Sequence, residues 1–233
     1  MISGVLQNAS WFVTDRLAGD SQEAFAFNNL AVHVGDDPAH VAANRAALSA
    51  VVGHPVVYTR AAHSALCHYV DEACPDVPGV DALITDVPGL ALAAQGADCA
   101  MIVVAAGDWV AAVHCGWRGL VAGVVPATLA ALEQRGAHLD NALAHLGPAI
   151  CGRCYRVDAR RAAEVAQVAE VAVVELSDGV GVDVRAGVLA QLAARGIRAT
   201  IDPRCTFEDP DLYSYRRDGL TGRQASVIVR EAA

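Results

Sequence analysis

The chain has 233 residues, of which 54% are hydrophobic, and a formal net charge of −9 at pH 7. Its basic side chains other than histidine are all arginines, and the absence of lysine excludes a P-loop lysine, a Schiff-base lysine, a pyridoxal-phosphate anchor and a Ser-Lys dyad. The negative charge argues against a nucleic-acid-binding surface, which needs a positive field, although a few arginines can still hold a small anion.

The N-terminal segment, residues 1–16, lacks the basic start and the small-residue cleavage site of a signal peptide, so we expect a cytoplasmic protein. No apolar run has the length needed to cross a membrane. Seven cysteines, an odd number, favour free thiols or metal ligands over a disulfide framework. The length and the lack of a linker predict one domain spanning residues 1–233.

The first clear element is a helix over residues 37–51, with Asp37 as its N-cap and Pro38 at its first position. A short strand over residues 55–62 then runs up to His63, and residues 81–99 supply a second strand, a Pro-Gly turn and another apolar segment. Residues 120–136 predict a helix that ends at Gly136 and that Pro126 either kinks or begins.

Further elements follow in the second half of the chain. We expect a strand and turn over residues 141–150, helices over 159–171 and 182–196, and a final strand over 222–231. Because strands and helices alternate without regular β-α-β spacing, the sequence predicts an α+β fold with mixed β-sheets layered with helices.

The most informative stretch is "CAMIVVAAGDWVAAVHC", residues 99–115, in which two apolar runs flank Gly107-Asp108. This dipeptide suits a two-residue hairpin turn, which places Met101 opposite His114 and Cys99 on the same face as His114. Cys115 then points to the other face. The β-carbons of the diagonal Cys-His pair would be roughly 7 Å apart, a spacing at which both side chains can reach one zinc ion.

Two ligands are too few for a stable zinc site, and His63 at the end of its strand is the preferred third ligand, with His68 as the reserve. A His2Cys set leaves a fourth position open for water or substrate, as catalytic zinc sites do. The alternative is a buried thiol beside a core histidine with no metal.

Other candidate motifs carry less information. Cys151-Gly152-Arg153-Cys154 is a single C-x2-C with no second pair at suitable spacing, so we interpret it as a pair of structural thiols. Residues 212–224, "LYSYRRDGLTGRQ", are either a solvated turn or an anion-binding loop, since two consecutive arginines suit bidentate capture of phosphate.

Five segments together resemble the YfiH or laccase-domain family: "NNLAVHVGDDPAHVAANRAAL", "DALITDVPGLALAAQGADCA", "VAAVHCGWRG", "LGPAICGRCYRVD" and "CTFEDPDLYSYRRDGLTGRQASVIV". They occur in the family's order over nearly the whole chain. The chain departs from the family's pattern at Ala61-Ala62, where a Gln-Val pair is usual, at Cys115, where Ala is usual, and at residues 16–30, which match a Gly-Gly-Val-Ser segment poorly.

The resemblance implies a zinc-dependent purine nucleoside phosphorylase, with His63, Cys99 and His114 as both metal ligands and catalytic residues. It implies adenosine, inosine, guanosine and methylthioadenosine as substrates, together with phosphate, and adenosine deamination as a second activity. For phosphate we name Arg118, Arg216 and Arg217 as candidates, and for the nucleoside Asn28 or Tyr215. Asp98, beside Cys99, is a candidate acid for deamination. We expect a monomer that binds neither nucleic acid nor membranes.

Three alternatives stay open. Copper binds N/S ligands more tightly than zinc, so a copper-dependent polyphenol oxidase of the laccase type is one, although multicopper oxidation needs several clustered histidines and only eight are scattered here. A metal-free Cys-His hydrolase is the second. The third is a non-catalytic metal-binding or scaffold protein.

Overall fold

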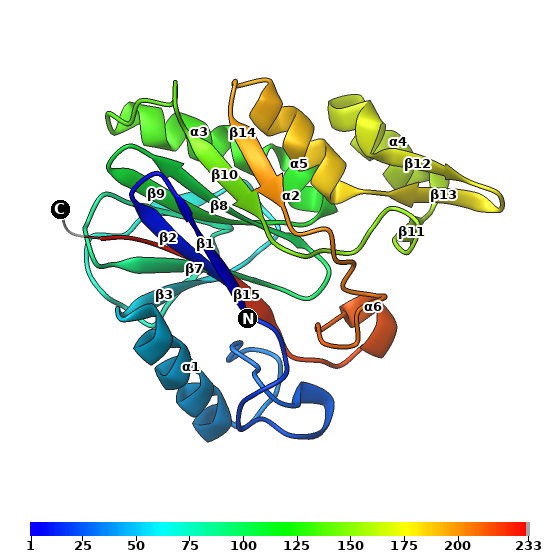
Figure 1. Cartoon of the computed structure of the whole chain (residues 1–233). Coiled ribbons are helices and arrows are strands. Elements are labelled where there is room, and N and C mark those ends of the chain that lie inside the picture. The colour runs from blue at the N-terminus through cyan, green and yellow to red at the C-terminus, as the bar shows by residue number, and fades with distance from the viewer. Residues whose placement is uncertain (232–233) are drawn as a thin grey trace.

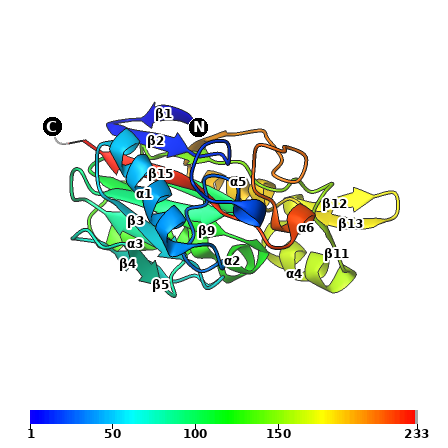
Figure 2. The same cartoon turned by 90° about the horizontal axis from the view of Figure 1, so that it is seen from below.

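The computed structural model of the chain describes residues 1–231, and within that range the strands form two six-stranded sheets and one three-stranded sheet. The two large sheets lie between helices, with α1 below and α2, α3 and α5 above in the view of Figure 1. Figure 2 shows the small sheet and α4 extending from one end of this layered body. The predicted α+β fold with mixed sheets is confirmed.

The first large sheet has the strand order β1-β2-β15-β7-β3-β5. Its strands are β1 (Ile2–Leu6), β2 (Ala9–Val13), β15 (Gln224–Arg230), β7 (Ala91–Gly96), β3 (Val56–Arg60) and β5 (Asp76–Pro78). The C-terminal strand β15 therefore lies in the interior of the sheet, antiparallel to both β2 and β7. β3 is parallel to both of its neighbours.

The second large sheet has the order β14-β10-β8-β9-β6-β4. Its strands are β14 (Arg198–Ile201), β10 (Leu143–Leu146), β8 (Ala100–Ala106), β9 (Trp109–Cys115), β6 (Ala82–Thr85) and β4 (Cys67–Tyr69). β8 and β9 form the predicted hairpin, with Met101 paired with His114 and Ala106 with Trp109. The predicted register is confirmed.

The small sheet and the helices complete the described part of the chain. The small sheet has the order β11 (Arg156–Val157), β13 (Gly179–Val182), β12 (Val173–Leu176). The helices are α1 (Pro38–Val52), α2 (Trp117–Ala122), α3 (Val124–Gln134), α4 (Ala159–Ala169), α5 (Val184–Ala193) and α6 (Tyr215–Asp218), with 3-10 turns at η1 (Glu23–Phe25) and η2 (Glu170–Ala172).

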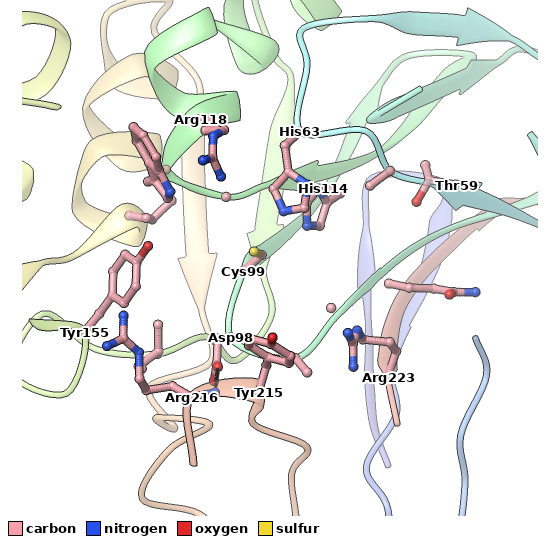
Figure 3. A pocket seen from close by; sticks show the side chains of 18 of the residues that line it. Thr59, His63, Asp98, Cys99, His114, Arg118, Tyr155, Tyr215, Arg216 and Arg223 are labelled. Atoms are coloured by element: carbon pink, nitrogen blue, oxygen red, sulfur yellow. Dashed lines mark hydrogen bonds between the residues drawn. The ribbon is translucent and has the colours of Figure 1, made fainter. Parts of the chain in front are cut away.

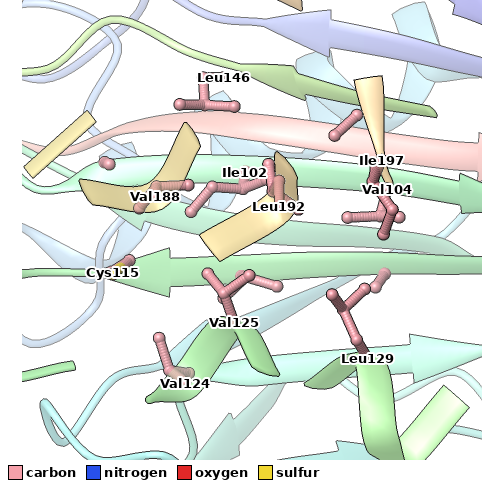
Figure 4. Packing of buried hydrophobic residues seen from close by; sticks show 14 of the residues in the cluster. Ile102, Val104, Cys115, Val124, Val125, Leu129, Leu146, Val188, Leu192 and Ile197 are labelled. Atoms are coloured by element: carbon pink, nitrogen blue, oxygen red, sulfur yellow. The ribbon is translucent and has the colours of Figure 1, made fainter. Parts of the chain in front are cut away.

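Alternation along β8 and β9 divides the core into layers. Ile102 and Val104 face the helices α3 and α5, where they pack in one apolar cluster with Leu129 and Leu192 (Figure 4). Met101 and Val103, one residue out of step, pack instead against the first sheet. A third cluster joins the other face of the first sheet to α1. The hairpin is thus buried on both faces.

Most predicted elements are present, and the differences have local causes. Asp37 caps α1 by accepting a hydrogen bond from the N–H of Ala39, as predicted. The helix predicted over residues 120–136 begins earlier, at Trp117, and is split into α2 and α3 by Gly123, whose φ of 79° no other residue adopts easily. Pro126 lies in the first turn of α3, where its missing N–H costs little.

The sequence does not predict β1, β2, β4, β5, β14 or the small sheet. These strands are short and partly exposed, so their apolar residues form no clear period. In the described part of the chain, no helix has both the length and the apolar character needed to cross a bilayer.

His145 in β10 links the two large sheets and generates a stability prediction. Its ring is 4% exposed, stacks on Trp11 of the first sheet at a centroid distance of 3.7 Å, and bonds through Nδ1 to Thr200 Oγ1 at 2.9 Å. Burial lowers the pKa of His145 from 6.5 to about 4, partly offset by the charge of Asp202. The unfolded chain therefore binds a proton in this pH window that the folded chain does not.

We predict that the free energy of unfolding falls between pH 6.5 and pH 4 because of His145, by up to about 1.4 kcal/mol per pH unit. His145→Phe keeps an aromatic ring but cannot titrate, so its stability should depend less on pH over the same interval. Urea unfolding of both proteins at about pH 7 and about pH 5 measures the difference. Equal losses in the two proteins would show that His145 is not the responsible group.

Candidate active site

The three predicted zinc ligands come together at one end of the hairpin (Figure 3). His63 follows β3, Cys99 immediately precedes β8 and His114 is the penultimate residue of β9. One ligand atom from each of the three lies within 4.8 Å of the others. The two imidazole rings meet edge to face, with centroids 5.0 Å apart and planes at 88°.

A buried carboxylate, that of Asp81, positions this cluster. Its Oδ1 lies 2.9 Å from Nδ1 of His114 and accepts the N–H of His63 at 3.0 Å. Its Oδ2 accepts the backbone N–H groups of Ala62 and Ser64 and the Ser64 hydroxyl. One side chain therefore fixes both the loop that carries His63, which has a left-handed φ of 57°, and the orientation of the His114 ring.

The charges at the site favour metal binding. Burial opposes ionisation of Asp81, but hydrogen bonds from His114 and Ser64 hold its pKa at about 2. Burial likewise opposes ionisation of Cys99, yet the neighbouring imidazoles of His114 and His63 lower its pKa to about 6. Against the effect of burial, the charges of Cys99 and Asp81 raise the pKa of His114 to about 9, so the Cys99 thiolate is paired with the His114 imidazolium. Because Asp81 occupies Nδ1 of His114, a metal ion would replace the proton on Nε2.

These donors fit a zinc or other borderline-soft divalent ion. Zinc ligands lie about 2.0–2.3 Å from the ion, so atoms already within 4.8 Å of one another need little movement to bind it. A carboxylate that orients a ligating histidine is the usual second layer of such centres. Gly116 makes the close approach possible, because a β-carbon there would lie 3.0 Å from Cys99 Sγ and 3.1 Å from His63 Cδ2.

Cys115 does not belong to the cluster, as the hairpin register predicted. Its side chain is fully buried on the opposite face, in the apolar cluster with Leu120 and Val124 (Figure 4). Burial raises the pKa of this thiol well above its ordinary value.

The cluster lies in the wall of a pocket of about 610 Å³, a volume typical of sites for small organic ligands. Four arginines and three aromatic residues line it, although the whole chain is acidic. The arginines are Arg118, Arg161, Arg216 and Arg223, and the aromatic residues are Trp117, Tyr155 and Tyr215. Such a lining can bind an anion beside a flat ring.

Aromatic rings hold the arginines in place. Arg118 and Arg161 both lie over Trp117, at 4.6 and 4.8 Å from the ring centroid, and Arg216 lies 5.0 Å from that of Tyr155. Nε of Arg161 is buried without a hydrogen-bond partner among the described residues. Nη2 of the same guanidinium lies 3.8 Å from Oδ2 of Asp158, so Arg161 lines the pocket with an acidic neighbour at its outer end.

Of the other residues predicted for the site, some line the pocket and some do not. Arg118, Tyr215 and Arg216 line the pocket. Arg217 does not, because its guanidinium donates to the carbonyls of Thr206, Phe207, Asp209 and Leu212 and pairs with Asp218. Asn28 also lies outside the lining and donates to the carbonyl of Asp15. His68 lies exposed on β4, apart from the other two histidines.

Asp98 lines the pocket as a positioning residue. Its carboxylate accepts hydrogen bonds from the hydroxyls of Thr206 and Ser214 and from the N–H of Arg216. These hydrogen bonds fix the Thr206 and Arg216 segments around the carboxylate, and the acid role named for Asp98 stays a prediction.

Sequence reasoning missed Asp81, His33, Arg161 and Arg223. The only indication of Asp81 in the sequence is that an acidic residue directly precedes a buried apolar strand. The sequence does not distinguish Arg161 from a solvent-exposed arginine on the polar face of a helix. His33 and Arg223 reach the pocket only through the pairing of distant strands.

Comparisons with known proteins identify the family of the chain. Residues 10–231 match a family model described as multi-copper polyphenol oxidoreductase laccase. The chain is 41% identical over 225 residues to a purine nucleoside phosphorylase of Corynebacterium glutamicum, covering 92% of each protein, and 42% identical over 232 residues to one of Streptomyces coelicolor, covering 96% of each.

Solved structures show the same fold. A Neisseria meningitidis protein superposes with a TM-score of 0.91 at 33% identity, covering 99% of both chains. YlmD from Geobacillus stearothermophilus superposes with a TM-score of 0.90 at 29% identity, covering 97% of this chain and 93% of its own.

We predict that Asp81→Asn lowers the affinity for zinc by about 10- to 100-fold, because an amide cannot accept all the hydrogen bonds that orient His114 and the His63 loop. Competition with a chromogenic chelator measures this affinity. Asp86→Asn is the matched control, since Asp86 lies just beyond the same strand and accepts the Tyr69 hydroxyl instead. Unchanged zinc affinity in Asp81→Asn would contradict the positioning role.

Proposed function

We propose that this chain, which belongs to the multi-copper polyphenol oxidoreductase laccase family, is a metal-dependent purine nucleoside phosphorylase. The observation that carries the proposal is the convergence of His63, Cys99 and His114 on one wall of a pocket whose other walls carry arginines and aromatic rings. Relatives named purine nucleoside phosphorylase match more than nine-tenths of the chain. Zinc is the metal we assign to the three ligands.

Phosphorolysis joins a phosphate oxygen to C1′ of the ribose and breaks the bond from C1′ to N9 of the purine. The electron pair of the broken bond leaves with the purine, and the proton brought by hydrogen phosphate balances its charge. The enzyme must therefore hold a dianion close to C1′ and orient the base. A divalent ion in the His2Cys site would supply a Lewis acid beside these reactants.

The arginines are the groups that we assign to phosphate. Arg118 and Arg161 both lie over the Trp117 ring, Arg216 lies over that of Tyr155, and all three arginines line the pocket. Guanidinium forks bind phosphate oxygens in pairs. Asp98 supports this part of the site, because it fixes the backbone of Arg216.

The aromatic side chains are the groups that we assign to the nucleoside. Trp117, Tyr155 and Tyr215 all line the pocket, and a purine can stack on such rings. Tyr215 is largely exposed, at 62%, so a bound base would cover it. Asn28, named as an alternative from the sequence, is not among the lining residues, and its amide donates to the carbonyl of Asp15, so we prefer Tyr215 for this role.

The finer assignments belong to the same proposal. We assign adenosine, inosine, guanosine and methylthioadenosine as substrates and adenosine deamination as a second activity, since the resemblance of the sequence implies them. Deamination needs no phosphate, so assays with and without phosphate separate the two reactions. We further assign the protein to the cytoplasm, because all seven cysteines are unpaired thiols in the structure and a reducing compartment keeps them so.

Two other chemistries have an observation in their favour. The family model carries an oxidoreductase name, which favours a copper oxidase, but among residues 1–231 the His2Cys cluster contains only two histidines. The close Cys99–His114 pair favours a metal-free hydrolase. Copper-dependent oxidation of a phenol, or nucleoside turnover that survives complete removal of metal, would support one of these instead.

We predict that Cys99→Ala lowers the rate of phosphate-dependent release of purine from inosine by about 100-fold or more. The variant should also lose the active-site metal. Cys115→Ala is the matched control, since Cys115 is sixteen positions further along but on the opposite face of the same hairpin, in the core. It should keep both metal and activity. Equal activity of the two variants would overturn the proposed function.

We predict that Arg161→Gln raises the KM for phosphate by about tenfold or more, because one charge-assisted hydrogen bond contributes about 1.5–3 kcal/mol. The KM for the nucleoside should change less. Its neighbour Arg160, which pairs with Glu164 on the exposed face of α4, provides the control Arg160→Gln. Steady-state kinetics with each substrate varied in turn distinguishes the two constants, and an unchanged phosphate KM would remove Arg161 from the phosphate site.

A further inference from the structure

We propose that Cys151, Cys154, Cys205 and Glu208 form a second metal site, a structural zinc site that is separate from the His2Cys cluster. One ligand atom from each of the four residues lies within 4.8 Å of the others. None of the four lines the active-site pocket. In the sequence the C-x2-C pair has no second cysteine pair that could complete a zinc site, and the sequence alone therefore indicates a pair of structural thiols.

The missing half of the site is a C-x2-E pair, and the two loops have the same backbone geometry. In the first loop the N–H groups of Cys154 and Tyr155 both donate to the carbonyl of Cys151. In the second loop the N–H groups of Glu208 and Asp209 both donate to the carbonyl of Cys205. Each loop therefore folds residues i and i+3 back beside one another, as the ligand loops of zinc ribbons must.

The two loops are held together before any ion binds. Ala149 and Cys205 form an isolated parallel bridge, and the N–H of Cys151 donates to Sγ of Cys205 at 3.3 Å. The thiol of Cys154 donates to Oε1 of Glu208 at 3.5 Å. Each residue of one pair thus already contacts a residue of the other, so binding requires little reorganisation.

The chemistry of the donors favours zinc in a closed, tetrahedral site. Three sulfur ligands select zinc over magnesium, calcium or manganese, and four protein ligands leave no position for a substrate. Three thiolates, one carboxylate and a divalent ion would carry a formal charge of about −2. Arg153 lines the hollow beside the cysteines and can offset part of this charge, whereas Arg185, which also lines it, is already paired with Asp183. Cys154 and Glu208 are partly or fully exposed, which gives the ion a route of entry.

A metal here would join a loop that borders the active-site pocket to a second loop that holds Asp98 in the pocket wall. Ile150 and Tyr155, on either side of the first pair, line the pocket. Thr206, directly after Cys205, donates its hydroxyl to Asp98 at 2.7 Å and accepts from Arg217. Zinc bound at this second site would therefore stabilise the pocket without touching its contents.

The test is zinc content of the full chain, purified with reductant and without added metal, then dialysed against Zn²⁺ alone. We expect two zinc ions per chain, one in each cluster. Cys154→Ser should lose one of them and Glu208→Gln should bind the same one more weakly, while Cys99→Ala should lose the other. Cys74→Ser, which changes a partly exposed cysteine outside both clusters, should lose none.

Melting temperatures measured with and without a chelator distinguish loss of zinc from misfolding of a variant. A chelator should lower the melting temperature of Cys99→Ala, which keeps only the second site, but not that of the double variant Cys99→Ala/Cys154→Ser, which keeps neither site. Glu208 is exposed, so Glu208→Gln should fold normally and report on affinity alone. Because Cys99→Ala empties the active-site cluster, the result is independent of the proposed function.

Two results would overturn the proposal. The first is Cys154→Ser with the same zinc content as the wild type. The second is fully reduced wild-type protein that binds no zinc at this cluster, while alkylation and mass spectrometry show a disulfide between Cys151 and Cys154 after purification without reductant. In that case the pair would be a redox-active dithiol instead.

Discussion

The geometry of the site depends on the buried carboxylate of Asp81 and on the hydrogen bonds that this carboxylate accepts. A charge in the interior is costly unless every lone pair finds a donor. Asp81 receives these donors from a loop that follows one sheet and from a histidine of the other. The need to satisfy this carboxylate therefore ties the His63 loop to β9, and the ligand geometry follows from that constraint.

The register of the β8–β9 hairpin determines which residues face the site and which face the core. Because side chains alternate, His114 and Cys115 are adjacent in sequence but belong to different environments, one polar and one apolar. A slip of one residue would bury His114 among aliphatic side chains and bring the wrong thiol to the site. The register is fixed on one face by packing against α3 and α5 and on the other by packing against the first sheet. Chemistry and packing thus select the same pairing.

Local signals in the sequence predicted the parts of the fold and the site that local physics determines. The Asp37-Pro38 cap, the Gly107-Asp108 turn and the hairpin register needed only short-range rules. The role of Arg217 could not be predicted in this way, since it differs from Arg216 only in which carbonyls surround it in three dimensions. Asp81 and the C-x2-E loop were missed because their partners are far away in the chain. Long-range satisfaction of polar groups leaves almost no trace in a single sequence.

The position of β15 has a consequence for biosynthesis. β15 is inserted between β2 and β7, so the β1–β2 hairpin has no partner in the first sheet until β15 has been synthesised. Arg223 and Tyr215, which reach the pocket, immediately precede that strand. Nascent or C-terminally truncated chains would expose two open sheet edges and an incomplete pocket, and such edges are prone to aggregation. The complete pocket therefore forms only when β15 is in place.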